Sequence, residues 1–192
     1  MSTYPVRTDH RWMRGTHGGR CRLGQIAWYE AAPTAVSPTA IHAAVTLHAT
    51  SPTSVTTEIS QPDVPRTISV TGNAETCAGN VVITGQDAAG RPLVATVTLA
   101  GTATITSLAA FGRVASVLLP ARAAAANTVS VGVGQGLGLV HTLATNATLM
   151  TTLDDGADDG TLSINATDLS KNLFTPEGVL DGAKVVRVLY VV

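Results

Sequence analysis

Apolar and small polar residues alternate along most of this chain, most clearly between residues 63 and 133. In the run from Leu93 to Leu99, the odd positions hold leucine, alanine and valine, and threonine recurs on the even positions. Successive side chains of a strand leave opposite faces of the backbone, so a period of two predicts β-strands. We therefore expect Val97 and Leu99 to point into a core.

Short alternating runs separated by glycine, asparagine and proline predict an all-β protein, an antiparallel β-sandwich. Valine, isoleucine and threonine are abundant in these runs and suit a pleated surface. The sandwich is expected to occupy residues 41–192. Strands are predicted at 41–47, 55–60, 127–133, 143–153, 161–165 and 185–192, and near Ile68, Val82, Val97, Ile105 and Val117.

The first forty residues differ in composition, and we interpret residues 1–40 as an extended N-terminal arm and linker. The first thirty residues hold five arginines and two acidic residues, a net charge of +3, and both tryptophans. Pro33 and Pro38 favour an extended linker. The pattern predicts that the domain folds without this arm.

Tryptophan, tyrosine and arginine are the residue types that dominate interface hot spots. The arm is therefore expected to dock on another subunit. The predicted interface residues are Arg7, Arg11, Trp12, Arg14, Arg20, Arg22, Trp28 and Tyr29. Two alternatives stay open: the aromatic residues could complete the core of their own domain, or the arginines could contact nucleic acid.

Composition and charge narrow the class of protein. Only 13% of the residues are charged and 4% are aromatic, while 45% are hydrophobic. A weakly charged surface is easiest to explain if other subunits cover much of it.

The net charge of −1 gives no reason to expect nucleic acid as a partner, and no apolar run approaches the roughly 20 residues that span a bilayer. The N-terminus lacks the apolar core of a secretory signal, so cytoplasmic assembly is expected.

No arrangement of residues predicts catalysis or a cofactor, and only one acidic segment leaves a metal site open. The histidines lack a neighbouring nucleophile, and Cys21 and Cys77 are interpreted as two unrelated thiols. The segment GQGLG lacks the residues of a phosphate-binding loop and predicts close packing or a bulge instead. The segment DDGADDG, with Asp154, Asp155, Asp158 and Asp159, predicts either an acidic turn or a calcium site.

Residues 61–101, QPDVPRTISVTGNAETCAGNVVITGQDAAGRPLVATVTLAG, resemble a β-rich module of tailed-bacteriophage virion structural proteins. Further segments that resemble this module lie in the second half of the chain and at its end. The resemblance is carried by turns and strands rather than by a catalytic signature. The matching segments are Gln61 to Arg66, Ser69 to Asn73, Gly79 to Gly90, Thr98 to Gly101, Val114 to Ala121, Asn127 to Leu139, and the terminal LDGAKVVRVLYV.

The resemblance implies a non-enzymatic virion protein that is assembled in the host cytoplasm. The leading expectation is a capsid decoration or cement protein that stabilises the phage head through its β-domain and arm. Its expected partners are the major capsid protein or other virion subunits, with a homo-oligomer on the particle. The alternatives are a tail or neck protein, a receptor- or carbohydrate-binding module, and a hydrolase that uses the acidic loop.

Overall fold

The computed structural model describes residues 12–14, 20–22 and 24–192 of the chain. In this part, all regular structure is strand except one 3-10 turn, η1 (Leu169–Lys171), and every strand pair is antiparallel. The prediction of an all-β, antiparallel, sandwich-like protein is confirmed. Near the N-terminus, β1 (Trp12–Arg14) pairs with β2 (Arg20–Arg22).

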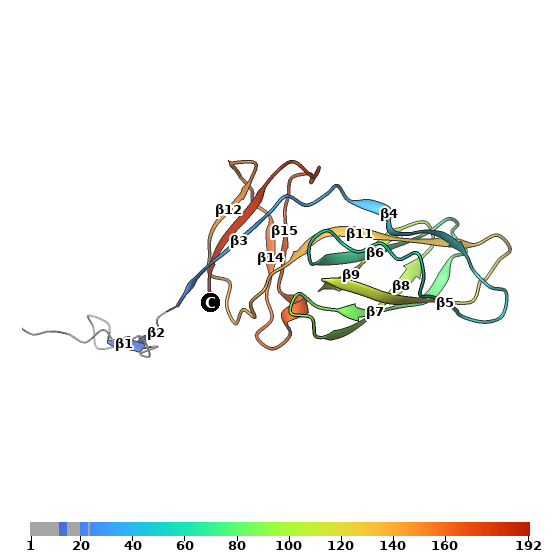
Figure 1. Cartoon of the computed structure of the whole chain (residues 1–192), viewed down its shortest axis with the longest axis horizontal. Helices are drawn as coiled ribbons and strands as arrows, with labels where there is room; N and C mark the ends of the chain where they lie inside the picture. Colours follow the sequence, from blue (N-terminus) through green and yellow to red (C-terminus); the bar gives the residue numbers. More distant parts are fainter. Residues whose placement is uncertain (1–11, 15–19, 23) are drawn as a thin grey trace, which may run out of the picture.

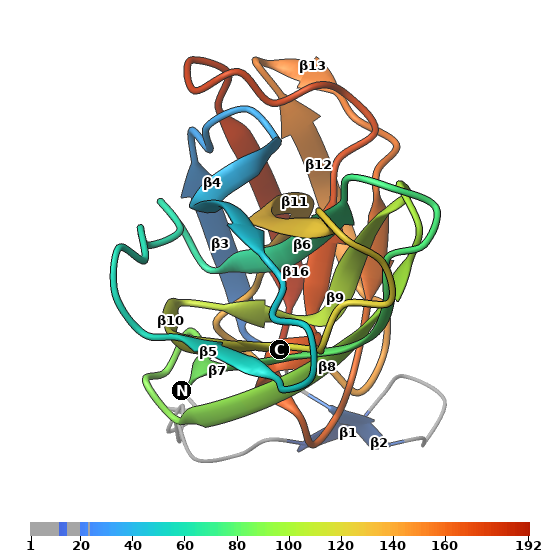
Figure 2. The ribbon, with the colours of Figure 1, turned by 90° about the vertical axis from the view of Figure 1, so that its right-hand side faces the viewer.

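Two sheets form the sandwich (Figure 2). The small sheet has the order β5 (Thr53–Val55), β10 (Arg113–Leu119), β7 (Ala78–Gln86) and β8 (Pro92–Ala100). The large sheet has the order β14 (Thr161–Ser163), β15 (Leu173–Thr175), β11 (Thr128–Gly138), β6 (Arg66–Gly72) and β9 (Thr104–Phe111), and β4 (Ser37–Thr46) also pairs with β11. The first core lies between the two sheets and is built almost entirely from valine, isoleucine and leucine.

The predicted register of β8 is confirmed. Val97 and Leu99 are buried in the first core, and Val97 is only 2% exposed. Val94 lies on the opposite face of the same strand and is 62% exposed. The alternation is preserved because β8 pairs with β7 without a bulge, from Pro92 to Ala100.

A third sheet, which we call the terminal sheet, contains both the first strand after residue 24 and the last strand of the chain. Its order is β13 (Gly156–Ala157), β12 (Thr148–Leu153), β16 (Val186–Val191) and β3 (Ile26–Ala31). Its inner face, with Val188 and Tyr190, encloses a second core with Phe174 of β15 and Leu137 of β11. Figure 1 shows β3 and β12 beside β14 and β15, at one end of the long strand β11.

Strand β11 connects the two cores. Val129, Val131 and Val133 lie in the first core, and Leu137 lies in the second. A Cβ atom on Gly138 would lie 2.6 Å from the Cβ atom of Ala110, so this position requires glycine. The prediction that these glycines permit close packing or a bulge is supported by the close approach at Gly138 and by a register shift between Val133 and Leu137, where β11 pairs with β6.

Arg66 lies fully buried at the start of β6, where it pairs with Leu137 of β11. Its Nε and Nη2 atoms donate hydrogen bonds to the carbonyl oxygen of Gly134 at 2.9 and 2.6 Å. Its Nη1 atom donates to the carbonyl oxygen of Thr34 at 3.0 Å and forms an ion pair with Asp63 at 3.1 Å. These contacts attach the segment before β4 to both cores.

The expected boundary between arm and sandwich at residue 40 is wrong, because it falls inside β4. Strand β3 also lies within the predicted arm, yet it pairs with β16 along its whole length. The sequence could not show this pairing, since the two strands lie about 160 positions apart. The strand expected at 55–60 is also wrong, because β5 ends at Val55 and turns follow.

Candidate interaction surface

The outer face of the terminal sheet carries a row of apolar side chains. Residues alternate between its faces, so Ala27 and Tyr29 of β3 pack toward the second core while Ile26 and Trp28 point outward. Trp28 pairs with Leu189 of β16, and Leu189 pairs with Met150 of β12. This Trp28–Leu189–Met150 row crosses three strands, and Trp28 is 50% exposed.

A polar row lies beside the apolar row on the same face. Arg187 of β16 pairs with Glu30 of β3 and donates a hydrogen bond from Nε to its carboxylate at 2.9 Å. Arg187 also contacts the Asp155 carboxylate through Nη1. Hydrogen bonds to Glu30 and Asp155 raise the pKa of the Arg187 guanidinium above its ordinary value. Trp28 Nε1 donates to Glu30 at 3.3 Å, which connects the apolar row to the charged one.

The DDGADDG segment lies at this charged end of the sheet. Asp154 and Asp155 both have positive φ, at 51° and 63°, and they connect the paired residues Leu153 and Gly156. Two central residues with positive φ form a type I′ hairpin turn, for which aspartate is among the favoured residues. The acidic-turn interpretation therefore describes this part of the segment.

Asp158 of the same segment is buried, unlike the surface residue that the acidic turn suggested. Its Oδ1 atom accepts hydrogen bonds from the backbone nitrogens of Gly160 and Glu177 at 2.9 and 3.0 Å. Its Oδ2 atom accepts from the nitrogen of Gly178 at 3.0 Å. Asp158 therefore holds two loops together. Across the described residues, no group of three or more His, Cys, Asp or Glu side chains is arranged to hold a metal ion.

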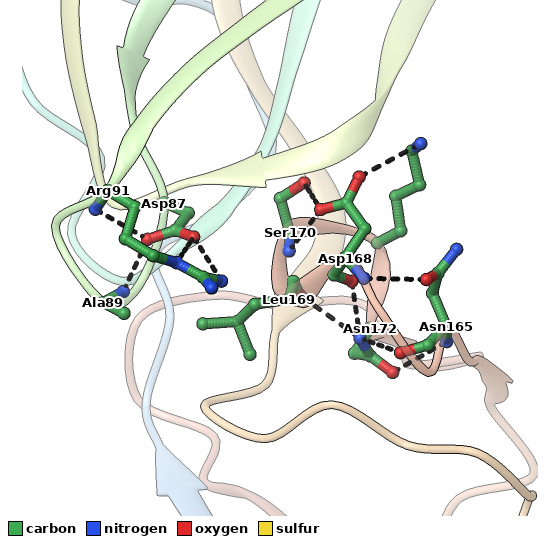
Figure 3. Close-up of polar contacts among 9 residues, drawn as sticks. Asp87, Ala89, Arg91, Asn165, Asp168, Leu169, Ser170 and Asn172 are labelled. Carbon is green, nitrogen blue, oxygen red and sulfur yellow. Dashed lines mark hydrogen bonds and ion pairs between the residues drawn. The ribbon is translucent and has the colours of Figure 1, made fainter.

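Two further loops are closed by carboxylates and amides (Figure 3). The buried Asn172 accepts hydrogen bonds at Oδ1 from the nitrogens of Leu143 and Asn165, and its Nδ2 donates to the carbonyl oxygen of Asp168 at 2.8 Å. The side chain of Asp168 accepts from the Ser170 hydroxyl at 2.6 Å. That hydrogen bond, with the neighbouring Lys171, lowers the pKa of Asp168. These polar groups satisfy one another and hold η1 in place.

The second loop in Figure 3 is the turn between β7 and β8. Asp87 accepts hydrogen bonds at Oδ1 from the backbone nitrogens of Ala89 and Arg91, at 2.8 and 3.0 Å. Its Oδ2 atom accepts from the Arg91 guanidinium at 2.8 Å. The carboxylate thus stabilises a turn that the sequence marked only by its glycine.

A pocket of about 260 Å³ lies beside the C-terminal end of β16. It is lined by Gly24, residues 142–145, Ala147, Val191 and Val192. None of these positions carries a carboxylate, imidazole or thiol side chain, so the lining offers no acid–base pair. No helix in the described part of the chain is long and apolar enough to cross a membrane.

The structure separates the residues predicted for the arm interface. Arg7 and Arg11 lie outside the described residues, while Trp12, Arg14, Arg20 and Arg22 belong to the β1–β2 pair, whose backbone alone is described. Trp28 lies on the outer face of the terminal sheet, as an interface residue requires.

The prediction that Tyr29 belongs to the interface is wrong, because its side chain points into the molecule and packs against the second core. Burial raises the pKa of Tyr29 to about 12. Its hydroxyl group is buried and has no hydrogen-bond partner among the described residues. Tyr29 therefore completes the core of its own domain, which is one of the alternatives that the sequence left open.

The sequence interpretation missed the other members of the surface, which are Met150, Asp155, Arg187 and Leu189. The alternation of VVRVLYVV does place Arg187 and Leu189 on one face of a strand. No local pattern indicates that β16 lies between β3 and β12, because strand order depends on contacts distant in sequence. No protein-family model, curated protein or solved structure matches this chain.

Proposed function

We propose that this protein is a non-enzymatic structural subunit of a tailed-phage virion, a capsid decoration or cement protein that binds neighbouring subunits through the outer face of its terminal sheet. The observation that carries this proposal is the Trp28–Leu189–Met150 row, which is apolar and crosses three strands, with Trp28 50% exposed, Met150 39% exposed and Leu189 half-buried between them. An apolar patch rimmed by polar residues marks a protein interaction site. Glu30 and Arg187 supply such a rim.

The proposed mechanism is mechanical. Burial of the row against a neighbour would contribute roughly 25 cal/mol for each Å² of apolar surface, reduced by the cost of association. Tryptophan and arginine are enriched among the residues that dominate such contacts. Many copies on one particle would multiply a modest stabilisation per contact. The resemblance of residues 61–101 to virion proteins supports the same assignment, and the proposed partners are the major capsid protein or other virion subunits, including further copies of this chain.

The second candidate is a receptor- or carbohydrate-binding module on the virion surface. The observation in its favour is that the exposed Trp28 ring lies beside Glu30 and Arg187, and an aromatic face next to polar groups suits a sugar ring. Binding of the purified protein to a glycan array, lost in Trp28→Ala, would favour this candidate over a decoration protein.

The decoration proposal is tested with particles that lack this protein. Purified chain is added to such particles, and bound protein is quantified after sedimentation. Saturable binding with a fixed copy number, together with a higher temperature of genome release, is expected. Trp28→Lys should weaken this binding. Leu108→Lys is its matched control, since Leu108 lies on β9, outside the terminal sheet, and is 83% exposed. Absence of binding by the folded wild-type protein would overturn the proposal.

A further inference from the structure

We propose that the outer face of the terminal sheet and its acidic end receive residues 1–22 of a second copy of this chain. This inference deepens the proposed function, on which it rests for the idea that many copies assemble side by side. It names one partner of the apolar row, a neighbouring copy, and one segment of that partner.

Positive and negative charge are separated along the chain. Residues 1–23 contain five arginines and one aspartate, a net charge of +4. Residues 24–192 contain seven basic and twelve acidic residues, a net charge of −5. The small overall charge therefore hides two regions of opposite sign. Regions of opposite charge steer two molecules toward each other and fix how they meet.

Much of the exposed negative charge lies at one end of the terminal sheet. Two neighbouring loops at one end of the terminal sheet, held together by Asp158, carry several exposed carboxylates. The basic groups here are few, and Arg187 and Lys184 already contact Glu30, Asp155 and Asp181. The exposed carboxylates in these loops are Asp154, Asp155, Asp159, Glu177 and Asp181.

An apolar surface and an acidic surface adjoin on the terminal sheet. The Trp28–Leu189–Met150 row lies next to the Glu30–Arg187 row, which leads to Asp155. A matching ligand combines aromatic or other apolar side chains with arginine. Residues 1–22 have this composition, with Tyr4, Trp12 and two methionines among five arginines. Arginine pairs with carboxylates through two parallel hydrogen bonds and also stacks on aromatic faces.

The position at which the arm leaves the terminal sheet favours the arm of a second copy over the chain's own arm. Gln25 exchanges backbone hydrogen bonds with Val192, so the arm departs at the Ile26 end of β3. The acidic loops lie at the opposite end, where Val186 pairs with Ala31 and with Leu153. Six residues of strand separate the two ends by roughly 20 Å. The chain's own arm would have to reverse and cross the whole face, whereas a neighbour placed end to end presents its arm directly.

With copies placed end to end, such a contact is heterologous, because the basic segment of one copy meets the acidic surface of the next and not the reverse. Heterologous contacts repeat from copy to copy and form rings or rows. This geometry suits a protein that covers a particle.

The test uses the full-length chain in solution, with p-benzoylphenylalanine in place of Trp12. Chains of normal and heavy isotope content are mixed, irradiated and analysed by mass spectrometry. We expect crosslinks between heavy and light chains that map to β3, β16 and β12. Trp28→Lys and the pair Asp159→Lys, Glu177→Lys should each reduce their yield at least about tenfold, because an interface hot spot contributes more than one factor of ten in affinity. The yield should also fall as salt is raised.

The matched controls are Leu108→Lys for the apolar change and Glu58→Lys for the charge reversal, both at exposed positions outside the terminal sheet. These controls should leave the yield unchanged. Crosslinks confined to single chains would show that each arm binds its own sheet, and crosslinks to another face would show a different receptor; either result overturns the proposal. Chains whose only change is the replacement of Trp12 test the proposal even if a charge variant fails to fold.

The outcome is separable from that of the decoration proposal. A chain that binds particles but shows no crosslinks between copies would overturn this inference and leave the decoration role standing. A chain that crosslinks between copies but does not bind particles would overturn the decoration role and leave this inference standing.

Discussion

Arg66 and Asp63 form an ion pair of 3.1 Å at the junction of the two cores. Arg66 is fully buried, while Asp63 is partly exposed and also accepts a hydrogen bond from the backbone nitrogen of Thr34 at 2.6 Å. The pair therefore neutralises a buried charge and holds the segment between β3 and β4. A buried guanidinium that loses its carboxylate is strongly unfavourable.

Asp63→Ala should lower the free energy of unfolding by roughly 2–4 kcal/mol, because the substitution leaves Arg66 buried without a counter-charge. Urea denaturation followed by circular dichroism measures this change. Lys184→Ala is the control, since it breaks an exposed ion pair with Asp181 and exposed pairs contribute little. Equal stability of the two variants would contradict the role assigned to Arg66.

The same carboxylate predicts a dependence on acid. Burial by itself would raise the pKa of Asp63, but the hydrogen bonds from Thr34 and Arg66 outweigh it and lower the pKa. A lowered pKa in the folded state contributes stability above the unfolded value of about 3.9, and this contribution is lost as the pH falls through the folded value. Wild-type protein should thus lose more stability than Asp63→Asn between about pH 5 and pH 2. If the free energy of unfolding fell by the same amount in both proteins over this pH range, the pKa of Asp63 would not be lowered.

Val97→Asp should destabilise the sandwich by about 4 kcal/mol or more, because it places an unpaired carboxylate in the first core. Val94→Asp is a matched control on the same strand, since Val94 points to solvent. We expect the control to unfold close to the wild-type midpoint in urea. Similar midpoints for both variants would mean that the register of β8 is wrong.

Removal of residues 1–22 should leave a folded protein, because β3 and its pairing with β16 remain intact. Removal of residues 1–38 should abolish cooperative unfolding, contrary to the expectation from the sequence that the domain folds without its arm, because it deletes β3, uncovers Val188 and Tyr190, and removes Thr34 from the Arg66 contacts. Differential scanning calorimetry of the two truncated proteins distinguishes these outcomes. A cooperative transition in the protein that lacks residues 1–38 would show that the terminal sheet is dispensable.

Tyr29 should titrate at about pH 12, which a Tyr29→Phe difference spectrum near 295 nm can detect. Since the folded state holds the phenol neutral, this group contributes stability below the unfolded pKa of about 10 that is lost as the pH rises toward 12. At neutral pH, Tyr29→Phe should keep or slightly raise stability, because the buried hydroxyl has no partner in the described structure. A large loss of stability in Tyr29→Phe would reveal a hydrogen bond at that hydroxyl.

The strands of the sandwich were predictable where local alternation and turn residues agree. Val97, Ile68 and Val131 all lie on predicted strands and face the first core. The terminal sheet was harder to predict, because IAWYEA holds four apolar or aromatic residues in succession, although burial alternates along β3 as it does along β8. Its high aromatic content and the prolines that follow favoured an arm, and nothing local indicates that its partner is the last strand of the chain.

Charged residues in the interior were missed for a related reason. Arginine and aspartate are rarely buried, so a pattern of apolar and polar positions assigns Arg66 and Asp158 to the surface. Their burial depends on the backbone groups that surround them, such as Gly134 for Arg66 and Gly178 for Asp158. Those groups approach only when distant segments pack together. The candidate surface combines both difficulties, since Trp28 was predicted and its neighbours Leu189, Met150 and Arg187 were not.

A cryo-EM map of the phage particle tests the proposed function most directly. The proposal predicts the sandwich in many regular copies on the particle, with Trp28, Leu189 and Met150 buried against a neighbouring chain. Particles from which this chain is absent, or a map in which the outer face of the terminal sheet points to solvent in every copy, would contradict it.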